Sequence, residues 1–195
     1  MSERAQMAVT HVRHRIDVEE YHRMAEAGVF DPERRIELIE GELIETVAPM
    51  NEPHAVGLSK LNALLVRRLS GRATIRCQSP VTLSDDSEPQ PDFAVVRLDP
   101  RDYIDRHPQP PDVHFLVEVA DSSRAFDQRR KIPLYARTGV AETWLVDLVD
   151  DRILAYRDPG PDGYATTVSA TRGESITPLA FRDERFDINE ILPVR

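Results

Sequence analysis

The sequence predicts an α/β or α+β fold in which helices flank a mixed central β-sheet, and three observations support this class. The chain has 195 residues, 41% of them hydrophobic, which is enough for one sizeable core. Helical and strand-like apolar patterns follow one another along the chain. Two apolar runs, residues 115–120 and 142–147, are typical of strands buried in the middle of a sheet.

Residues 1–15 are polar and are expected to form a flexible N-terminus ahead of a single domain over residues 16–195. The chain has no apolar run near the roughly 20 residues of a membrane helix, and its start lacks the apolar core of a signal peptide. Its single cysteine, Cys77, cannot form an internal disulfide, which fits a reducing compartment, and is expected to be at least half-buried in a strand. We therefore expect a cytoplasmic protein with no membrane contact.

The N-terminal half is predicted to contain a helix, a β-hairpin, a long helix and three strands, at residues 18–27, 35–46, 51–70, 74–77, 81–83 and 93–97. Asp17 and Asn51 can cap the two helices. Gly41 lies at the centre of the hairpin, where positive φ is required. Leucines at helical spacing predict the core-facing side of the long helix: Leu58, Leu61, Leu65 and Leu69.

The C-terminal half is predicted to contain a strand, a helix, a strand, a hairpin and a last helical turn, at residues 114–120, 127–138, 142–147, 152–169 and 187–192. Asp127 is expected to cap the helix. Pro133 is expected either to kink it or to make Ile132 the start of its regular part. The polar loop over residues 98–113 is long for a compact domain, which suggests the hypothesis of an arm in a homodimer.

Glu118 is the first residue that points to chemistry, because it lies between two valines in the apolar run Phe115-Leu-Val-Glu-Val-Ala. An ionised carboxylate in a buried strand is unfavourable by several kcal/mol unless a cation compensates it. A metal ion, a buried basic partner, or a strand that ends in water before Glu118 would each explain it. The residues alone leave these three explanations open.

Asp92 lies directly before another apolar run, and its strand precedes the Glu118 strand along the chain. Pro-Asp is by itself a common turn dipeptide. Carboxylates on neighbouring strands can share one hard cation, typically Mg²⁺, which polarises a phosphoryl group. Lys131 is one of only two lysines in an arginine-rich chain, the other being Lys60. Lysine can orient or deprotonate water in a way that arginine cannot.

Together these residues resemble a known signature. Pro91-Asp92 followed by Glu118-Val119-Ala120 is similar to the pattern of PD-(D/E)XK nucleases. The stretch after Glu118 resembles the Uma-two family, a bacterial group of restriction endonuclease-like proteins also described as a domain of unknown function, at Lys131, Tyr135, Gly139-Val140 and Trp144. Two N-terminal motifs are also similar, so that the resemblance covers residues 18–156: Glu37-Leu-Ile-Glu-Gly-Glu-Leu and Pro53-His54-Ala.

The resemblance implies a restriction-endonuclease-like fold and hydrolysis of phosphodiester bonds that depends on Mg²⁺, or on Mn²⁺ in its place. It implies that Asp92, Glu118 and the Val119 carbonyl hold the metal. Lys131 would orient the attacking water or stabilise charge on the phosphate. The usual pattern has a lysine two residues after the glutamate, where this chain has Ala120. In the Uma-two group the lysine has moved to the following helix, and the small Ala120 would leave room for it.

Two further residues are secondary candidates. Glu37 shares one face of the predicted hairpin with Glu42, and it could add a carboxylate to the site or be a solvated residue of the sheet. His54 lies in the first turn of the long helix, where the helix dipole favours an anion. It could contact phosphate or water at the metal, or make an ordinary polar contact at the helix start.

The net charge of −9 counts against tight, sequence-independent binding of nucleic acid. We therefore expect an endonuclease that binds nucleic acid, preferably DNA, weakly and transiently at a local site. Two alternatives are a catalytically silent nuclease fold used for binding or regulation, and a metal-dependent hydrolase of a smaller phosphoester. A Lys131 directed away from both carboxylates would favour the silent fold, and a small closed pocket would favour the phosphoesterase.

Overall fold

The computed structural model describes residues 12–46 and 52–194. Its centre is a six-stranded sheet with the strand order β3-β4-β5-β6-β7-β8. Only β5 and β6 run parallel, and the other neighbours are antiparallel, so the sheet is mixed as predicted. The strands are β3 (Thr74–Cys77), β4 (Phe93–Val96), β5 (Val113–Ala120), β6 (Glu142–Asp147), β7 (Arg152–Gly160) and β8 (Gly163–Thr171).

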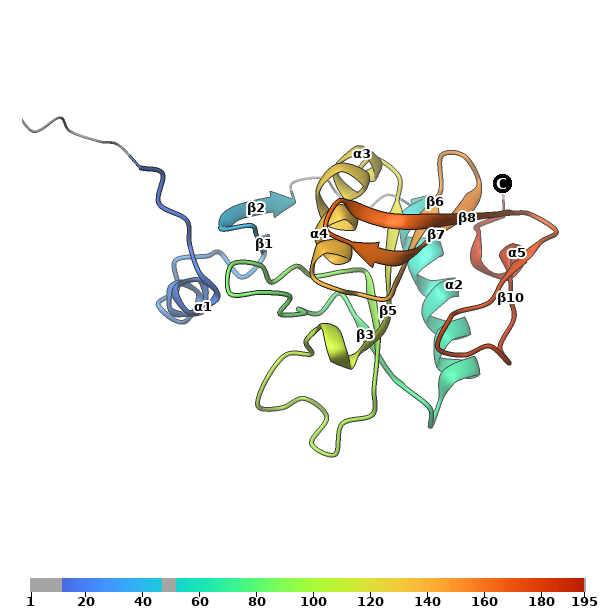
Figure 1. Ribbon diagram of the computed structural model, residues 1–195, viewed down its shortest axis with the longest axis horizontal. Coiled ribbons are helices and arrows are strands. Elements are labelled where there is room, and N and C mark those ends of the chain that lie inside the picture. Colours follow the sequence, from blue (N-terminus) through green and yellow to red (C-terminus); the bar gives the residue numbers. More distant parts are fainter. Residues whose placement is uncertain (1–11, 47–51, 195) are drawn as a thin grey trace, which may run out of the picture.

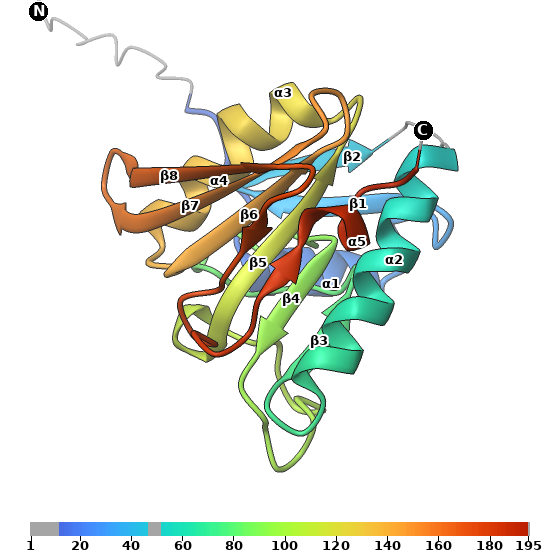
Figure 2. The same ribbon diagram turned by 90° about the vertical axis from the view of Figure 1, so that its right-hand side faces the viewer.

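Helices cover both faces of this sheet, as Figures 1 and 2 show: α2 (Glu52–Leu69) and α5 (Ile188–Ile191) lie on one side, and α3 (Arg124–Phe126) and α4 (Ile132–Arg137) on the other. The predicted leucine side of α2 is buried in the larger core cluster. Side chains alternate across β5, so that Val117 and Val119 join this cluster while Leu116 packs on the α4 side. Glu118 therefore faces the α4 side as well.

The N-terminal elements lie outside the central sheet. Helix α1 (Val18–Glu26) begins at Asp17, which forms a capping box with Glu20. The hairpin of β1 (Arg35–Ile39) and β2 (Glu42–Thr46) turns at Glu40 and Gly41, whose φ angles are 51° and 73°. Two successive positive φ values match the tight hairpin turn predicted there. The proposed cap Asn51 and most of the expected flexible N-terminus, residues 1–11, lie outside the described residues.

Two predictions are wrong: the strand at residues 81–83 and the burial of Cys77. Residues 81–83 form no strand, because their amides bond to turns and to the long loop: Val81 to Pro89 and Thr82 to Pro108, both at 3.0 Å. Cys77 is exposed, because β3 is the edge strand of the sheet. No pattern in the sequence predicted the two-stranded sheet of β9 (Ser175–Ile176) and β10 (Phe186–Asp187). The second of these strands directly precedes α5.

The helical segment after β5 starts earlier than predicted and includes a π-helical turn, η2 (Asp127–Lys131), between α3 and α4. Asp127 is therefore not a helix cap: its backbone is helical, and its side chain accepts a hydrogen bond of 2.7 Å from Ser123 Oγ. The regular α-helix does begin at Ile132, as expected from Pro133. Proline has no N–H to give to the preceding turn, and a wider turn is one way to accommodate it.

The long loop after β4 folds back on its own chain. Tyr103 is buried, and its hydroxyl donates to the Arg97 carbonyl at 3.0 Å. The Arg97 amide bonds at 2.8 Å to the carbonyl of Asp112, the last residue of the short 3₁₀ turn η1 (Pro110–Asp112). These bonds close the loop at its base, and the homodimer stays a prediction. None of the helices in the described ranges combines the length and apolar character of a transmembrane span.

Replacing Leu65 with alanine tests the packing of α2 on the sheet. Leu65 is fully buried in the core cluster, so Leu65→Ala should lower the free energy of unfolding by about 2–5 kcal/mol. The neighbouring Val66 is 47% exposed, and Val66→Ala should change it by less than about 0.5 kcal/mol. Urea denaturation of both variants measures the difference, and equal effects would contradict the described orientation of α2.

Candidate active site

The structure brings the five predicted side chains into one cavity of about 320 Å³. The cavity lies where the end of β5 meets the start of β4, the β1 strand, the first turn of α2 and the π-helical turn. Its lining includes Asp92, Glu118, Lys131, Glu37 and His54. They come from five segments that are far apart in the sequence, so the fold alone makes them neighbours.

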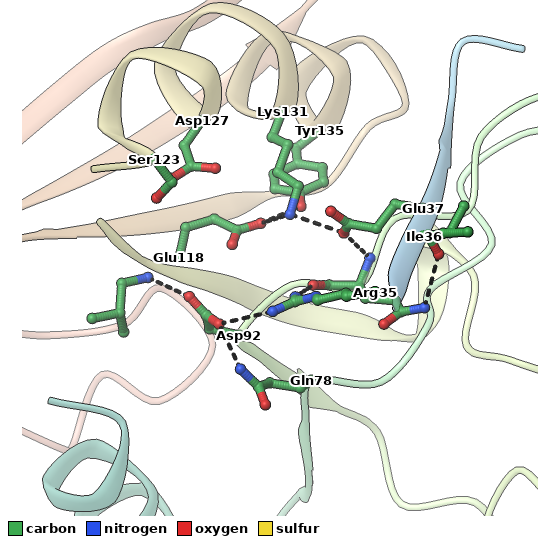
Figure 3. Close-up of polar contacts among 12 residues, drawn as sticks. Arg35, Ile36, Glu37, Gln78, Asp92, Glu118, Ser123, Asp127, Lys131 and Tyr135 are labelled. Carbon is green, nitrogen blue, oxygen red and sulfur yellow. Dashed lines mark hydrogen bonds and ion pairs between the residues drawn. The ribbon is translucent and has the colours of Figure 1, made fainter. Parts of the chain in front are cut away.

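Lys131 lies between two buried carboxylates, as Figure 3 shows. Its Nζ is 3.0 Å from Glu37 Oε1 and 3.2 Å from Glu118 Oε1. The side chain is only 4% exposed. Tyr135, one helical turn after Lys131, donates from its hydroxyl to the same Glu118 oxygen at 2.5 Å. The second oxygen, Oε2, accepts no hydrogen bond from the described residues.

Asp92 is fixed from the other side of the cavity. Its Oδ2 accepts a hydrogen bond of 2.8 Å from the Val119 amide, which ties the start of β4 to the end of β5. Its Oδ1 faces weaker partners: Gln78 Nε2 at 3.3 Å, an Arg35 guanidinium nitrogen at 3.7 Å and His54 Nε2 at 3.9 Å. One oxygen is thus used to position Asp92, while the other points into the cavity (Figure 3).

Lys131 reaches the site from the helical segment, which explains why this chain has Ala120 where the usual pattern has a lysine. Ala120 is fully buried and belongs to a small apolar cluster with Ile132, Leu145 and Leu154. A long side chain at position 120 would have to displace this cluster. The small residue lets the helical segment pack close to β5, and the π-helical turn buries Asp127 and Lys131 together against the cavity.

The cavity holds more acid than base. Four buried carboxylates, Glu37, Asp92, Glu118 and Asp127, face the cations Lys131 and Arg35, which leaves two negative charges uncompensated when all are ionised. Burial raises the pKa of Glu118 to about 8, with Lys131 opposing the shift and the neighbouring carboxylates adding to it. Burial also raises the pKa of Asp127.

Lys131 itself stays protonated. Burial alone would lower its pKa, but Glu118, Glu37 and Asp127 outweigh that effect and raise the pKa above its ordinary value. The lysine is therefore a fixed cation and a hydrogen-bond donor in this state, and it is a poor base.

Sequence reasoning missed three residues of the site. Arg35 lies two positions before Glu37 on β1, so strand alternation could have placed both on one face. Tyr135 lies four positions after Lys131, and helical spacing could have placed it beside the lysine. Gln78 gave no signal, because it reaches Asp92 only through a backbone with a φ of 45° after β3. The alternative reading of Glu37 as a solvated residue is wrong, since it is 2% exposed.

The sequence matches the Uma2 family, described as "Putative restriction endonuclease", over residues 18–189. The chain belongs to this family. Among solved structures it is similar to the crystal structure of a putative nuclease belonging to DUF820 from Anabaena variabilis ATCC 29413. That likeness has a TM-score of 0.66 at 16% identity and covers 90% of this chain and 97% of the other. No curated protein matches the chain.

The Uma2 match spans every segment that contributes to the cavity, from β1 to α4. The structural likeness confirms the predicted fold: a mixed sheet between helices, shared with a nuclease-like protein of low sequence identity. At 16% identity it supports the fold alone. The roles of the cavity residues in this Uma2 protein therefore depend on the geometry described above.

The raised pKa of Glu118 gives the metal-free protein a specific pH dependence. Between pH 4.5 and about 8, the unfolded chain has released the Glu118 proton while the folded chain keeps it. The contribution of Glu118 to the free energy of unfolding is therefore fully present below pH 4.5 and is lost as the pH rises to about 8. Within this window the free energy of unfolding falls by up to about 1.4 kcal/mol per pH unit. Denaturation with a chelator present should show this loss.

The Glu118→Gln variant isolates that contribution, because glutamine cannot titrate. The free energy of unfolding of the wild type should fall relative to Glu118→Gln as the pH rises through this window. The exposed Glu19 provides the control, since Glu19→Gln should follow the wild-type curve. Parallel curves for the wild type and Glu118→Gln would contradict a buried proton on Glu118.

Proposed function

We propose that this protein is a metal-dependent endonuclease that hydrolyses phosphodiester bonds in nucleic acid, with DNA as the favoured substrate. One observation carries the proposal: Lys131 is held between Glu118 and Glu37 in the same cavity as Asp92. Carboxylates can hold a metal ion that polarises a phosphoryl group, and a fixed lysine beside them can stabilise the charge that develops on it. Membership of a family described as "Putative restriction endonuclease" agrees with it.

The donor set fits a hard divalent cation. Asp92 and Glu118 each present one oxygen that is not used in a short hydrogen bond, and the cavity has an excess of negative charge. Mg²⁺ takes oxygen ligands of this kind. We propose Val119 as a third ligand through its carbonyl. The strand β4 begins at Phe93, which pairs with Val117, so no residue of β4 pairs with Val119, and the Val119 amide points to Asp92. The amide and carbonyl of a strand residue face the same side.

Each residue of the cavity then has a defined task. Asp92 and Glu118 would hold Mg²⁺, or Mn²⁺ in its place, which supplies positive charge that polarises a phosphoryl group. Lys131, being protonated, donates hydrogen bonds that orient the attacking water or stabilise charge on the phosphate. Tyr135 and Glu37 hold Glu118 and Lys131 in place from behind. His54 lies on the open side of Asp92, where it can contact a phosphate or a water.

The acidity of the cavity sets the order of binding. A phosphate would meet six carboxylates here, against Lys131, Arg35 and the histidine: Glu33, Glu37, Asp92, Glu118, Asp121 and Asp127. Nucleic acid is therefore repelled until a divalent cation is present. We therefore expect weak and transient binding of nucleic acid by a chain whose net charge is −9.

The two alternatives fare differently. The silent nuclease fold is disfavoured, because Lys131 points at Glu118 and not away from the carboxylates. A phosphoesterase acting on a smaller molecule keeps one observation in its favour, since a cavity of about 320 Å³ is at the low end for a ligand site. Cleavage of a mononucleotide ester but of no polymer would establish that second function.

The two lysines of the chain provide a matched test. Lys131→Met should lower Mg²⁺-dependent cleavage of single- and double-stranded DNA and RNA by about 100-fold or more, while Mg²⁺ still binds. Lys60 contacts the Asn189 and Leu192 carbonyls on the far side of α2, so Lys60→Met should cleave like the wild type. Gel assays measure cleavage, and calorimetry measures binding of Mg²⁺ or Mn²⁺.

Glu118→Ala should lose both cleavage and metal binding, since it removes a ligand. Cleavage that persists in Lys131→Met would remove the lysine from the mechanism. If the wild type cleaves no polymer with either metal and calorimetry detects no metal, the silent fold becomes the better description.

Tyr135→Phe tests the positioning of Glu118. The variant removes the hydroxyl that donates to Glu118 Oε1 but keeps the ring, which is fully buried. Loss of an outer partner of a metal ligand typically weakens metal affinity by about 10–100-fold. Cleavage by Tyr135→Phe should therefore need a higher Mg²⁺ concentration and recover at saturation. A lower maximal rate at every Mg²⁺ concentration would instead assign the hydroxyl a role in the reaction itself.

A further inference from the structure

A second group of ligand-type side chains lies outside the cavity, at His22, Glu88 and His107. We propose that these residues form a separate site for a divalent transition metal ion of the Zn²⁺ type. They come from α1, from the segment between β3 and β4, and from the long loop after β4. One ligand atom from each residue lies within 4.8 Å of the other two.

The distances are close to those that a bound ion requires. His22 Nε2 is 2.7 Å from Glu88 Oε1, and His107 Nε2 is 4.0 Å from the same oxygen. Bonds of about 2.0–2.1 Å in a tetrahedral site separate two ligand atoms by about 3.3 Å. The distance from His22 to Glu88 would have to increase and the distance from His107 to Glu88 to decrease, each by less than about 1 Å. Rotation of the side chains can supply both changes.

The burial and the hydrogen bonding of Glu88 are those of a metal ligand and not of a surface carboxylate. It is 1% exposed, and Thr82 Oγ1 donates to its Oε2 at 2.6 Å. This bond fixes the carboxylate with Oε1 directed at the two imidazoles, as outer partners of metal ligands do. Within the described ranges its only ion-pair partners are the two histidines. If both imidazoles are neutral, the buried charge lacks a cation.

His107 also lacks a conventional partner. Its Nδ1 is buried without a hydrogen bond, and its Nε2 is too far from Glu88 for one. The ring nevertheless faces the carboxylate and packs edge-on to His22, with centroids 6.1 Å apart. A metal ion between the three groups would bind His107 through Nε2, which has no hydrogen bond to Glu88, and would place a cation beside the buried Glu88 carboxylate.

The ligand types distinguish this site from the acidic cavity. Two imidazoles and one carboxylate favour Zn²⁺ and its neighbours in the transition series over Mg²⁺, which prefers oxygen. The His22 side chain is 44% exposed, and a cavity of about 360 Å³ adjoins both histidines. That space leaves a fourth coordination position for water.

An ion here would join three segments that otherwise meet through few bonds. Glu88 is anchored to the hairpin, because its amide donates to the Leu38 carbonyl at 2.8 Å. Four residues later the same segment reaches Asp92. The ion would therefore pin α1 and the long loop to the segment that carries Asp92, without touching the cavity itself.

Zinc binding by a protein with a disabled cavity tests the proposal. The double variant Asp92→Asn/Glu118→Gln removes the acidic ligands, so any remaining site can be titrated with Zn²⁺ alone after chelator treatment. Calorimetry should show one equivalent of Zn²⁺ per chain, and Co²⁺ in its place should give the strong visible absorption of a four-coordinate ion. Adding His107→Ala or His22→Ala should weaken Zn²⁺ binding by at least about tenfold.

His14→Ala in the same background is the matched control, because His14 is exposed and its ion-pair partner among the described residues is Glu20, outside the proposed site. It should bind Zn²⁺ unchanged, and circular dichroism establishes that each variant is folded. The proposal is overturned if the double variant binds no Zn²⁺, or if removal of either His22 or His107 leaves the affinity unchanged. Cleavage by the wild type with Mg²⁺ is measured separately, so failure of this site and failure of the proposed nuclease are distinguishable.

Discussion

The burial of Lys131 against two glutamates is the constraint on which the assembly of this protein depends. Glu37 belongs to the hairpin, Glu118 to the central sheet and Lys131 to the helical segment, and each is at most 4% exposed. Any one of these charges buried without the others would be strongly unfavourable. The hairpin adds no strand to the sheet, so β1 is held against the domain by this network, by the Leu38–Glu88 bridge and by the burial of Ile39 in the core cluster on the α4 side.

The cations of the cavity compensate only part of its negative charge. Under the proposed function, this links the stability of the protein to its activity. A cavity with matched charges would be a structural ion-pair network with no need for a ligand. Here four buried carboxylates face two cations. Burial first, and the neighbouring carboxylates after it, raise the pKa of Glu118. Under the proposed function, a divalent cation would complete such a site. With that cation bound, the acidic chain would accept the polyanionic substrate proposed for it.

Local patterns were enough for much of the fold and for part of the site. The apolar runs around Glu118 and Trp144 predicted the central strands, because burial on both faces leaves a continuous hydrophobic signal. The π-helical turn could not be predicted, since it depends on how Pro133 is accommodated while Lys131 is buried. Strands of two residues, such as β9, have no local pattern at all. The burial of Glu37 depends on the docking of the hairpin, which is a tertiary event.

The division of the site between sheet and helix has a consequence for the newly made chain. The two proposed metal ligands, Asp92 and Glu118, come from the ends of neighbouring strands, whereas Lys131 arrives only when residues 124–137 dock on β5. A partly folded molecule with a formed sheet and an undocked helix would hold a metal but lack the lysine. With the role proposed for Lys131, such a molecule would be inert toward the nucleic acids of the cell that makes it. Under the proposed mechanism, placing the lysine on the helix thus makes cleavage conditional on complete folding.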